Sequence, residues 1–191
     1  MDKSDQDIVL DYIAGNEKAF STLVDRHMRS VYTLAYGITQ SNADAEDITA
    51  DTFLKAWKNI KKYKKEFAFK TWLLTIGRNT TLDFLRKRKH SVFSDFENES
   101  GENYFAETLT DNNALSALEE FAVSENKKVV ADALQKVSGT YREILTLRYG
   151  EDMTFEEIAA LTGKPMNTVK SQVRRGLLVL KEAMGGGNAP N

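Results

Sequence analysis

A cluster of basic and hydroxyl side chains near the carboxyl end of the chain has the chemistry of nucleic-acid recognition. The cluster consists of Thr168, Lys170, Ser171, Arg174 and Arg175. Arginine and lysine donate to phosphates and to guanine edges, and short hydroxyl side chains bond to base edges. The apolar residues that alternate with the cluster at helical spacing are Val169, Val173, Leu177 and Leu180. This pattern predicts one helix that packs on its apolar side and offers its polar side to DNA.

The residues before this cluster predict a second, shorter helix that would support it. Thr154, followed by Glu157 three residues later, matches a capping box at a helix start. Gly163 can adopt the positive φ that ends a helix, and Pro165 is tolerated in the first turn of the helix that follows. Ala159 leaves room for a partner helix. The segment therefore predicts a DNA-binding helix-turn-helix; a helical hairpin with a solvated basic face is the alternative.

A second group of chemically active side chains is acidic. Asp44, Asp47 and Asp51 fall at i, i+3 and i+7, on one face of a helix, with Glu46 beside them. An acidic face suits a basic protein partner, and carboxylates near a helix N-terminus also stabilise the helix. A metal site is disfavoured, because hard cations need oxygens that converge from several directions and no histidine is placed to help.

The elements that must position these groups are helices. Apolar residues recur at helical spacing almost throughout the chain, and no strand pattern of period two persists. In the first half, the spacing predicts a short helix over 4–14, a helix that starts at the cap Asn16, and a helix behind Asn42. The apolar stripe of the helix behind Asn42 includes Leu54 and Trp57. A further helix runs from Phe69 through Trp72, which we expect in the core, to the basic residues at 86–89.

The second half predicts a separate helical unit. Helical spacing resumes at 129–137, Gly139 ends that helix, and residues 141–149 form the next one. Charge also divides the chain: residues 1–54 carry a net −6, residues 55–90 a net +10, residues 91–126 a net −9 and residues 127–191 a net +3. We therefore expect an all-α protein with a first domain over 1–90, an acidic flexible linker over 91–125, a second domain over 126–184 and a disordered tail over 185–191.

Composition excludes several classes of function. The chain has no cysteine, which excludes a disulfide framework, a thiolate zinc site and a cysteine nucleophile. Its N-terminus lacks the basic-then-apolar pattern of a secretory signal, and no apolar run reaches the ~18 residues of a membrane span. We expect a soluble, cytoplasmic protein with no membrane insertion, no cofactor and no metal.

Residues 44–90, which begin DAEDITADTFLKAW, and residues 141–176, which begin YREILTLRYG, closely resemble the bacterial sigma-70 family. The chain is most similar to the extracytoplasmic-function (ECF) members, which keep only the helical domains called region 2 and region 4. The resemblance spans about 5–90 and 126–184. It implies a sigma factor, not an enzyme, that binds core RNA polymerase and directs recognition of the −10 and −35 promoter elements, melting and initiation. An anti-sigma factor is a further partner that the family implies.

The resemblance also implies roles for individual residues. The acidic group Asp44, Glu46, Asp47 and Asp51 would bind the coiled coil of the β′ clamp of the polymerase. The loop that would capture a flipped −10 base is Lys62, Tyr63, Lys64, Lys65, Glu66 and Phe67. It departs from the commoner small-residue pattern at Lys64, Lys65 and Phe67.

The remaining implied contacts are with promoter DNA. Arg78 and Asn79 would face −10 bases, because asparagine donates and accepts at once. Arg86, Lys87, Arg88 and Lys89 would hold phosphates. In the second domain Thr168, Lys170, Ser171, Arg174 and Arg175 would face the −35 element. Arg175 is the first candidate for bidentate guanine contact, and Arg148 would contact phosphate.

Two other functions are weighed against this one. A helix-turn-helix regulator that acts without polymerase would share the 168–173 pattern, but the response-regulator type needs an N-terminal βαβ domain that this sequence does not predict. A small all-α metal-dependent hydrolase would use the carboxylates of 44–51 and would need a second set of ligands. Co-purification with RNA polymerase distinguishes these functions.

Overall fold

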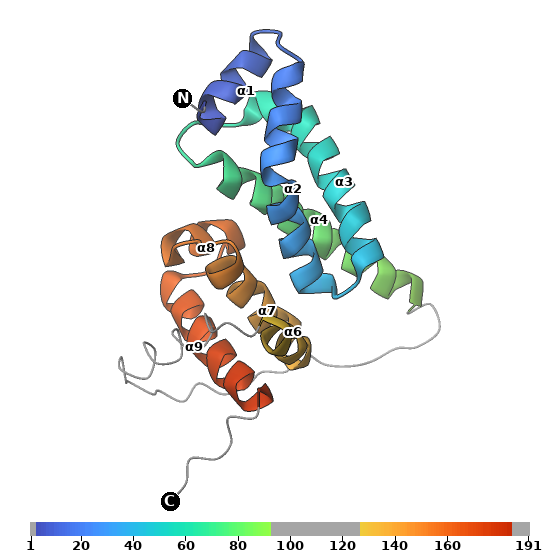
Figure 1. Ribbon diagram of the computed structural model, residues 1–191, viewed down its shortest axis with the longest axis vertical. Helices are drawn as coiled ribbons and strands as arrows, with labels where there is room; N and C mark the ends of the chain where they lie inside the picture. The colour runs from blue at the N-terminus through green and yellow to red at the C-terminus, as the bar shows by residue number, and fades with distance from the viewer. Residues whose placement is uncertain (1–2, 93–126, 185–191) are drawn as a thin grey trace, which may run out of the picture.

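The computed structural model describes residues 3–92 and 127–184, and the side chains of 3–88 and 132–184. All regular structure in these ranges is helical, which confirms the predicted all-α class. Figure 1 shows two groups of helices, α1 to α4 in blue and green and α6 to α9 in yellow to red, that lie side by side. The predicted acidic linker over 91–125, apart from Ser91 and Val92 at the end of α4, and the predicted tail over 185–191 lie outside the described residues.

The first group is built around one long central helix. Its elements are α1 (Asp5–Ile13), α2 (Lys18–Thr39), α3 (Asn42–Asn59), the 3-10 turn η1 (Ile60–Lys62) and α4 (Phe69–Val92). Helix α2 packs against α1, α3 and α4. Leu23, Val31 and Leu34 of α2 and Leu73 and Leu74 of α4 are completely buried between them. Each buried leucine contributes about 1.5–3 kcal/mol to folding, so this packing holds α4 against α2.

Two predicted helix starts are wrong by one residue. Helix α2 begins at Lys18 with Glu17 as its cap residue, one residue later than predicted, although Glu17 has helical φ and ψ and makes no side-chain cap. Helix α3 is capped by Ser41, not Asn42: Ser41 is extended, and its Oγ accepts from the backbone N–H of Asp44 at 3.3 Å. An extended residue with a free hydroxyl satisfies an N–H of the first turn, which an asparagine already inside the helix cannot do.

The predicted apolar stripe of α3 is also partly wrong. Leu54 and Trp57 are 48% and 49% exposed. The buried line of α3 runs instead through Ala45, Ile48, Thr49, Thr52, Phe53 and Ala56. Two threonines occupy that line because their hydroxyls bond back to carbonyls one turn earlier, at 2.7 Å each. Leu54 and Trp57 therefore remain on the surface of the helix.

The second group forms the predicted helix-turn-helix and two helices before it. Its elements are α6 (Lys127–Lys136), α7 (Gly139–Leu145), the π-helical turn η2 (Thr146–Gly150), α8 (Phe155–Thr162) and α9 (Met166–Ala183). The capping box of Thr154 and Glu157 is present, and Gly163 ends α8 with φ +69°. Val169, Val173, Leu177 and Leu180 are buried, as their spacing predicts.

Three details of this group differ from the prediction. Gly139 begins α7 and does not end α6, because Ser138 already has the extended backbone of a residue that precedes a helix. The helix predicted over 141–149 changes to π geometry at Thr146. Pro165 precedes α9 as its N-cap residue and lies one residue outside the first turn. The apolar residues predicted at 129 and 130 have side chains outside the described residues.

Gly163 provides a test of the helix-turn-helix. Replacement by alanine should lower the free energy of unfolding by about 1–2 kcal/mol, because a Cβ strains the left-handed conformation. No other atom lies within 4 Å of that Cβ, so the cost comes from the backbone alone. The measurement is the urea concentration at the midpoint of unfolding.

Gly139→Ala is the matched control. The φ of Gly139 lies outside the positive range, and an added Cβ meets only the end of Arg142 at 3.9 Å. This substitution should therefore be neutral or stabilising. A Gly163→Ala protein at least as stable as the parent would contradict the turn.

The two groups contact each other directly. Helix α2 packs against α7 and η2, and α4 packs against α8, which is visible in Figure 1. Within 3–92 and 127–184, no helix is both long and apolar enough to cross a membrane.

Candidate functional site

The polar residues of α9 form one exposed strip beside its buried line. Thr168 and Lys170 are exposed, and Ser171, Arg174 and Arg175 are partly exposed. Because Thr168, Ser171 and Arg175 are spaced i, i+3 and i+7, they share one face, and Lys170 and Arg174 form the adjoining line. No carboxylate in the described parts of the chain forms an ion pair with Arg174 or Arg175. Neither guanidinium is neutralised by a carboxylate within these parts of the chain.

The side chain of Arg148 makes contacts inside the second domain. Its Nη1 donates to the backbone oxygen of Met153 at 3.0 Å, and its guanidinium lies 5.1 Å from the ring of Phe155. The Nζ of Lys170 lies 5.8 Å from the same ring. Arg148 and Lys170, which stands near the start of the α9 strip, therefore both lie against the ring of Phe155. The guanidinium supports the loop before α8, and a phosphate contact by Arg148 stays a prediction.

The predicted base-capturing loop is held by Tyr63. The phenol oxygen of Tyr63 donates to the backbone oxygen of Phe67 at 2.7 Å, and its ring lies 5.5 Å from the rings of Phe69 and Trp72. Burial raises the pKa of Tyr63 above its usual value, so the phenol stays protonated and can donate. Lys62, Lys64, Lys65 and Glu66 are exposed, and Phe67 is 56% exposed. The structure therefore makes Tyr63 the anchor of the loop and Phe67 its exposed aromatic ring.

A groove of about 410 Å³ lies where α3, η1 and α4 meet. It brings together Lys62 and Asn79, two of the residues predicted to contact the −10 element. Its other walls include Lys55, Asn59, Trp72 and Asp83. Lys55 and Asn59 were not predicted, although their spacing with Lys62 (i, i+4, i+7) is the pattern of one helical face. Cations, amides and an aromatic edge in one groove can hold the backbone and bases of a single strand.

Arg78 does not join Asn79 in this groove. Its side chain is 15% exposed and donates from Nε to the carboxylate of Glu143 on α7. Arg86 pairs with Asp83 at 3.0 Å, and Arg88 pairs with Asp44 at 2.6 Å. Lys87 is exposed, and the side chain of Lys89 lies outside the described residues. Of these basic residues, only the 86–88 cluster presents an open surface.

The acidic face of α3 is exposed except at its first member. Glu46, Asp47 and Asp51 are exposed, whereas the side chain of Asp44 is 18% exposed because of its pair with Arg88. Leu54 follows Asp51 by three residues and extends this face with an apolar side chain. We call Asp47, Asp51 and Leu54 the α3 face. In the part of the chain that the structure describes, no group of three or more His, Cys, Asp or Glu side chains is arranged to hold a metal ion.

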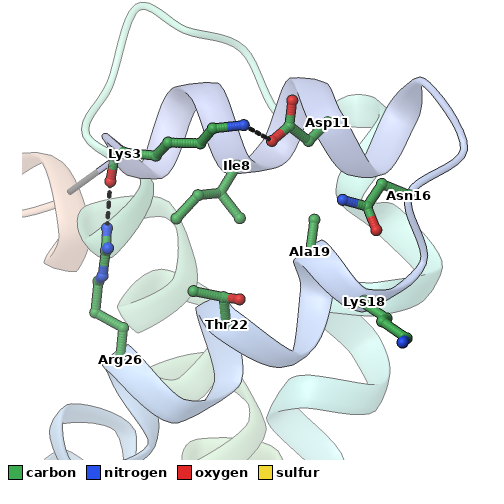
Figure 2. Close-up of a pocket in the computed structure, with 8 residues that line it drawn as sticks. All are labelled: Lys3, Ile8, Asp11, Asn16, Lys18, Ala19, Thr22 and Arg26. Atoms are coloured by element: carbon green, nitrogen blue, oxygen red, sulfur yellow. Dashed lines mark hydrogen bonds and ion pairs between the residues drawn. The ribbon is translucent and has the colours of Figure 1, made fainter. Parts of the chain in front are cut away.

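A second hollow, of about 310 Å³, lies between α1 and α2 and is drawn in Figure 2. The Nζ of Lys3 is paired with Asp11 at 2.6 Å, and Arg26 donates to the backbone oxygen of Lys3 at 3.1 Å and pairs with Asp5 at 2.6 Å. These contacts occupy Lys3 and Arg26, two of the cations that line the hollow, and link α1 to α2, which indicates a structural role.

Comparison with known proteins matches both groups of helices. Residues 23–91 match the family model for Sigma-70 region 2, and residues 127–180 match that for Sigma-70, region 4. The chain is 31% identical to the ECF RNA polymerase sigma-E factor of Haemophilus influenzae over 174 residues, which cover 90% of each chain. It is 29% identical to the ECF RNA polymerase sigma factor SigW of Bacillus subtilis, over 89% of this chain and 91% of that protein.

Solved structures show the same fold. The sigma factor RpoE of Bartonella quintana, in complex with the anti-sigma factor NepR, matches with a TM-score of 0.68 at 24% identity, over 90% of this chain and 99% of that one. CnrH, in complex with the cytosolic domain of CnrY, matches with a TM-score of 0.67 at 22% identity, over 97% of this chain and the whole of that one.

Proposed function

The chain belongs to the sigma-70 family and is an RNA polymerase sigma factor of the ECF group, and we propose that three surfaces of it carry that function. These are the polar strip of α9, the groove between α3 and α4, and the α3 face. The observation that carries the proposal is that the three surfaces are separate from one another. Each has a distinct chemistry, and each lies within a segment that matches a sigma region. The protein acts by binding and positioning, with no catalysis and no cofactor of its own.

The α9 strip reads the −35 element. Helix α9 is held by α8 through the Gly163 turn, which is the arrangement that places such a helix in the major groove. Thr168, Lys170 and Ser171 lie toward its N-terminal half, where side chains reach base edges. Arg175 can bond in bidentate fashion to the O6 and N7 atoms of a guanine. Arg174 and Arg148 lie at the margins and hold phosphates.

The groove between α3 and α4 binds the −10 strand after melting. Asn79 and Asn59 offer amides to base edges, and Lys55 and Lys62 face the backbone. The exposed ring of Phe67 gives a stacking surface beside the groove. Lys64, Lys65 and Glu66 complete the loop, and Arg86 and Arg88 extend the positive surface along α4.

The α3 face binds core polymerase, and a second protein regulates the factor. An acidic face with an apolar residue at one end suits a basic helical partner such as the coiled coil of the β′ clamp, with Glu46 and Asp44 at its edge. The sigma factor RpoE of Bartonella quintana, which has a similar fold, has been solved with the anti-sigma factor NepR bound. We extend this to an anti-sigma partner for the present chain. A helix-turn-helix regulator that works without polymerase would leave the α3 face without use.

Transcription with purified core polymerase tests the function as a whole. The full-length protein should co-purify with core polymerase and support run-off transcription from a subset of a randomised promoter library. The selected promoters should contain two conserved elements, one read by each domain. DNA binding without polymerase association, and without any selected promoter, would favour the independent regulator.

Exchange of the loop at residues 64–67 tests whether the two domains recognise the −10 and −35 elements independently. With Tyr63 left in place to anchor the loop, grafting the corresponding residues of another ECF factor should change the preferred −10 sequence. The preferred −35 sequence should stay the same, because α9 belongs to the other domain. Promoter selection measures both elements in one experiment. Lys170→Ala is the reciprocal control, since it should alter only the −35 preference. A graft that shifts both elements would contradict separate reading.

A further inference from the structure

Helix α1 takes no part in the three proposed surfaces, and the match to Sigma-70 region 2 begins only at residue 23, after α1 has ended. The start of α1 nevertheless lies beside the loop of residues 62–67 (Figure 1). The Nε2 of Gln6 donates to the backbone oxygen of Lys65 at 3.4 Å. We call residues 62–67 the −10 loop. The structure thus joins this loop to a helix that the region 2 match does not include.

The amide of Gln6 also reaches the residue that anchors the −10 loop. Gln6 is a hydrogen-bond partner of the Tyr63 side chain, and the hydroxyl of Tyr63 donates to the backbone oxygen of Phe67 at 2.7 Å. A primary amide has two N–H donors, so one side chain can hold the carbonyl of Lys65 and the phenol oxygen together. Gln6, Tyr63 and the loop carbonyls therefore form one hydrogen-bonded network.

The residue before Gln6 fixes the start of α1 on α2. The carboxylate of Asp5 pairs with Arg26 at 2.6 Å and with the Nε2 of His27 at 2.7 Å. The side chains of Asp5 and His27 are 21% and 8% exposed. Polar contacts that are shielded from water in this way are stronger than contacts on an open surface. The turn of α1 that carries Gln6 is therefore held in place independently of the loop.

A line of aromatic rings forms a second connection from α1 to the −10 loop. The ring of His27, which is bonded to Asp5, lies 5.5 Å from the ring of Phe69. The ring of Phe69 lies 5.5 Å from that of Tyr63. Phe69 is buried, and aromatic pairs at this separation attract each other beyond the effect of burial alone. Both connections from α1 therefore end on Tyr63, the anchor of the loop.

We propose that Gln6 is a positioning residue for −10 recognition: with Asp5 and His27 behind it, Gln6 sets the conformation of the −10 loop and so the strength of its base preference. A loop that captures a base needs its backbone and its ring in one geometry, which supporting hydrogen bonds provide. This inference rests on the proposed −10 role of the loop. A contact that only stabilised the fold would act on both promoter elements alike.

A spin label on the −10 loop tests the contact without DNA. The chain has no cysteine, so Glu66→Cys gives a unique and exposed labelling site. Gln6→Ala and Gln6→Glu should both raise the mobility of the label, because neither a methyl group nor a carboxylate can donate to the carbonyl of Lys65. Gln135→Ala and Gln135→Glu make the same changes at an exposed site on α6 and should leave the spectrum unchanged. Equal mobility in all five proteins, the labelled parent included, would overturn the positioning role.

Transcription by holoenzyme assembled with core polymerase tests the consequence. The ratio of activities on two promoters that differ at one −10 base measures −10 discrimination. Gln6→Ala and Gln6→Glu should lower this ratio about two- to tenfold, the effect of one net hydrogen bond. The ratio for two promoters that differ at one −35 base should not change, and neither should the urea concentration at the midpoint of unfolding, because Gln6 is exposed. An unchanged −10 ratio, or an equal fall in both ratios, would overturn the inference.

Phe67→Ala separates failure of this inference from failure of the proposed function. The substitution removes the exposed ring of the −10 loop itself. If Phe67→Ala lowers the −10 ratio and the Gln6 variants do not, the loop reads the base and only the role of Gln6 is wrong. If Phe67→Ala and the loop exchange both leave the −10 preference unchanged, the loop does not read the base. The proposed −10 role would then fail, and the effect of Gln6 on promoters would fail with it.

Discussion

Alanine at Asp47, Asp51 and Leu54 together should weaken binding to core RNA polymerase by about 100-fold. Truncation of an interface anchor costs about 1–2 kcal/mol in the centre of a contact, and three such losses of about 1 kcal/mol give this factor. All three side chains are exposed on α3, which packs through its other side. The substitutions should therefore leave helicity and the unfolding midpoint almost unchanged.

A titration of labelled protein with core polymerase measures this loss, and circular dichroism controls for folding. A matched control is available on the other helices: Glu17, Asp25 and Met28 are two exposed acids and an exposed apolar residue outside α3. Alanine at these positions removes the same charge and a similar apolar area, and should leave polymerase affinity unchanged. Equal losses in the two triple variants would mean that net charge, and not the α3 face, governs binding.

Asp44 is left out of this variant for a structural reason. Its carboxylate pairs with Arg88 at 2.6 Å, and its backbone N–H is bonded to the hydroxyl of Ser41. Asp44→Ala would remove a favourable carboxylate from the first turn of α3 and would break its pair with Arg88 at once. A loss of polymerase binding in that variant would have two explanations, whereas the loss at Asp47, Asp51 and Leu54 has one.

Local signals explain which parts of the fold could be predicted from the sequence. The capping box at Thr154, the left-handed Gly163 and the buried line of α9 depend on residues within a few positions of one another. Each is therefore visible in the chain itself. The error at Asn42 has the same origin, because Ser41 and Asn42 can both cap a helix and stand side by side, and only the backbone angles decide between them.

Leu54 and Trp57 show the limit of predicting burial from local sequence patterns. Both fit an apolar stripe, yet threonines with satisfied hydroxyls occupy the buried line of α3 in their place. Periodicity assigns apolar residues to the core and cannot separate a core leucine from one kept for a partner. The exposed Leu54 became part of a candidate site only when the packing of α3 against α2 and α4 was known.

No local sequence pattern could predict the contacts between residues that are distant in the chain. The bond from Arg78 to Glu143 joins positions 65 residues apart, and the groove of Lys55, Asn59 and Asn79 needs α3 and α4 to cross. Family resemblance supplied Arg78 and Asn79 as a pair. The structure separates them, with Asn79 in the groove and Arg78 against the second domain.

Arg175→Ala should reduce binding to the preferred −35 element by about 5- to 150-fold, the effect of about 1–3 kcal/mol for one bidentate base contact. Arg175 shares a face of α9 with Thr168 and Ser171, and Val169 and Val173 fix that face by their burial. The loss should be largest for the promoter with the best −35 sequence and small for a promoter with a substituted base. Fluorescence anisotropy on both duplexes measures the ratio.

Arg175→Lys separates a base contact from a phosphate contact. Lysine keeps the positive charge but lacks the planar pair of donors, so it should retain the salt dependence of binding while losing most of the discrimination between the two duplexes. Arg175→Ala should lose the discrimination and also lower the slope of log affinity against log salt by about one. If lysine preserves the discrimination, or if alanine weakens both duplexes equally, Arg175 holds phosphate. The guanine contact would then have to come from Lys170, the remaining cation in the N-terminal half of the strip.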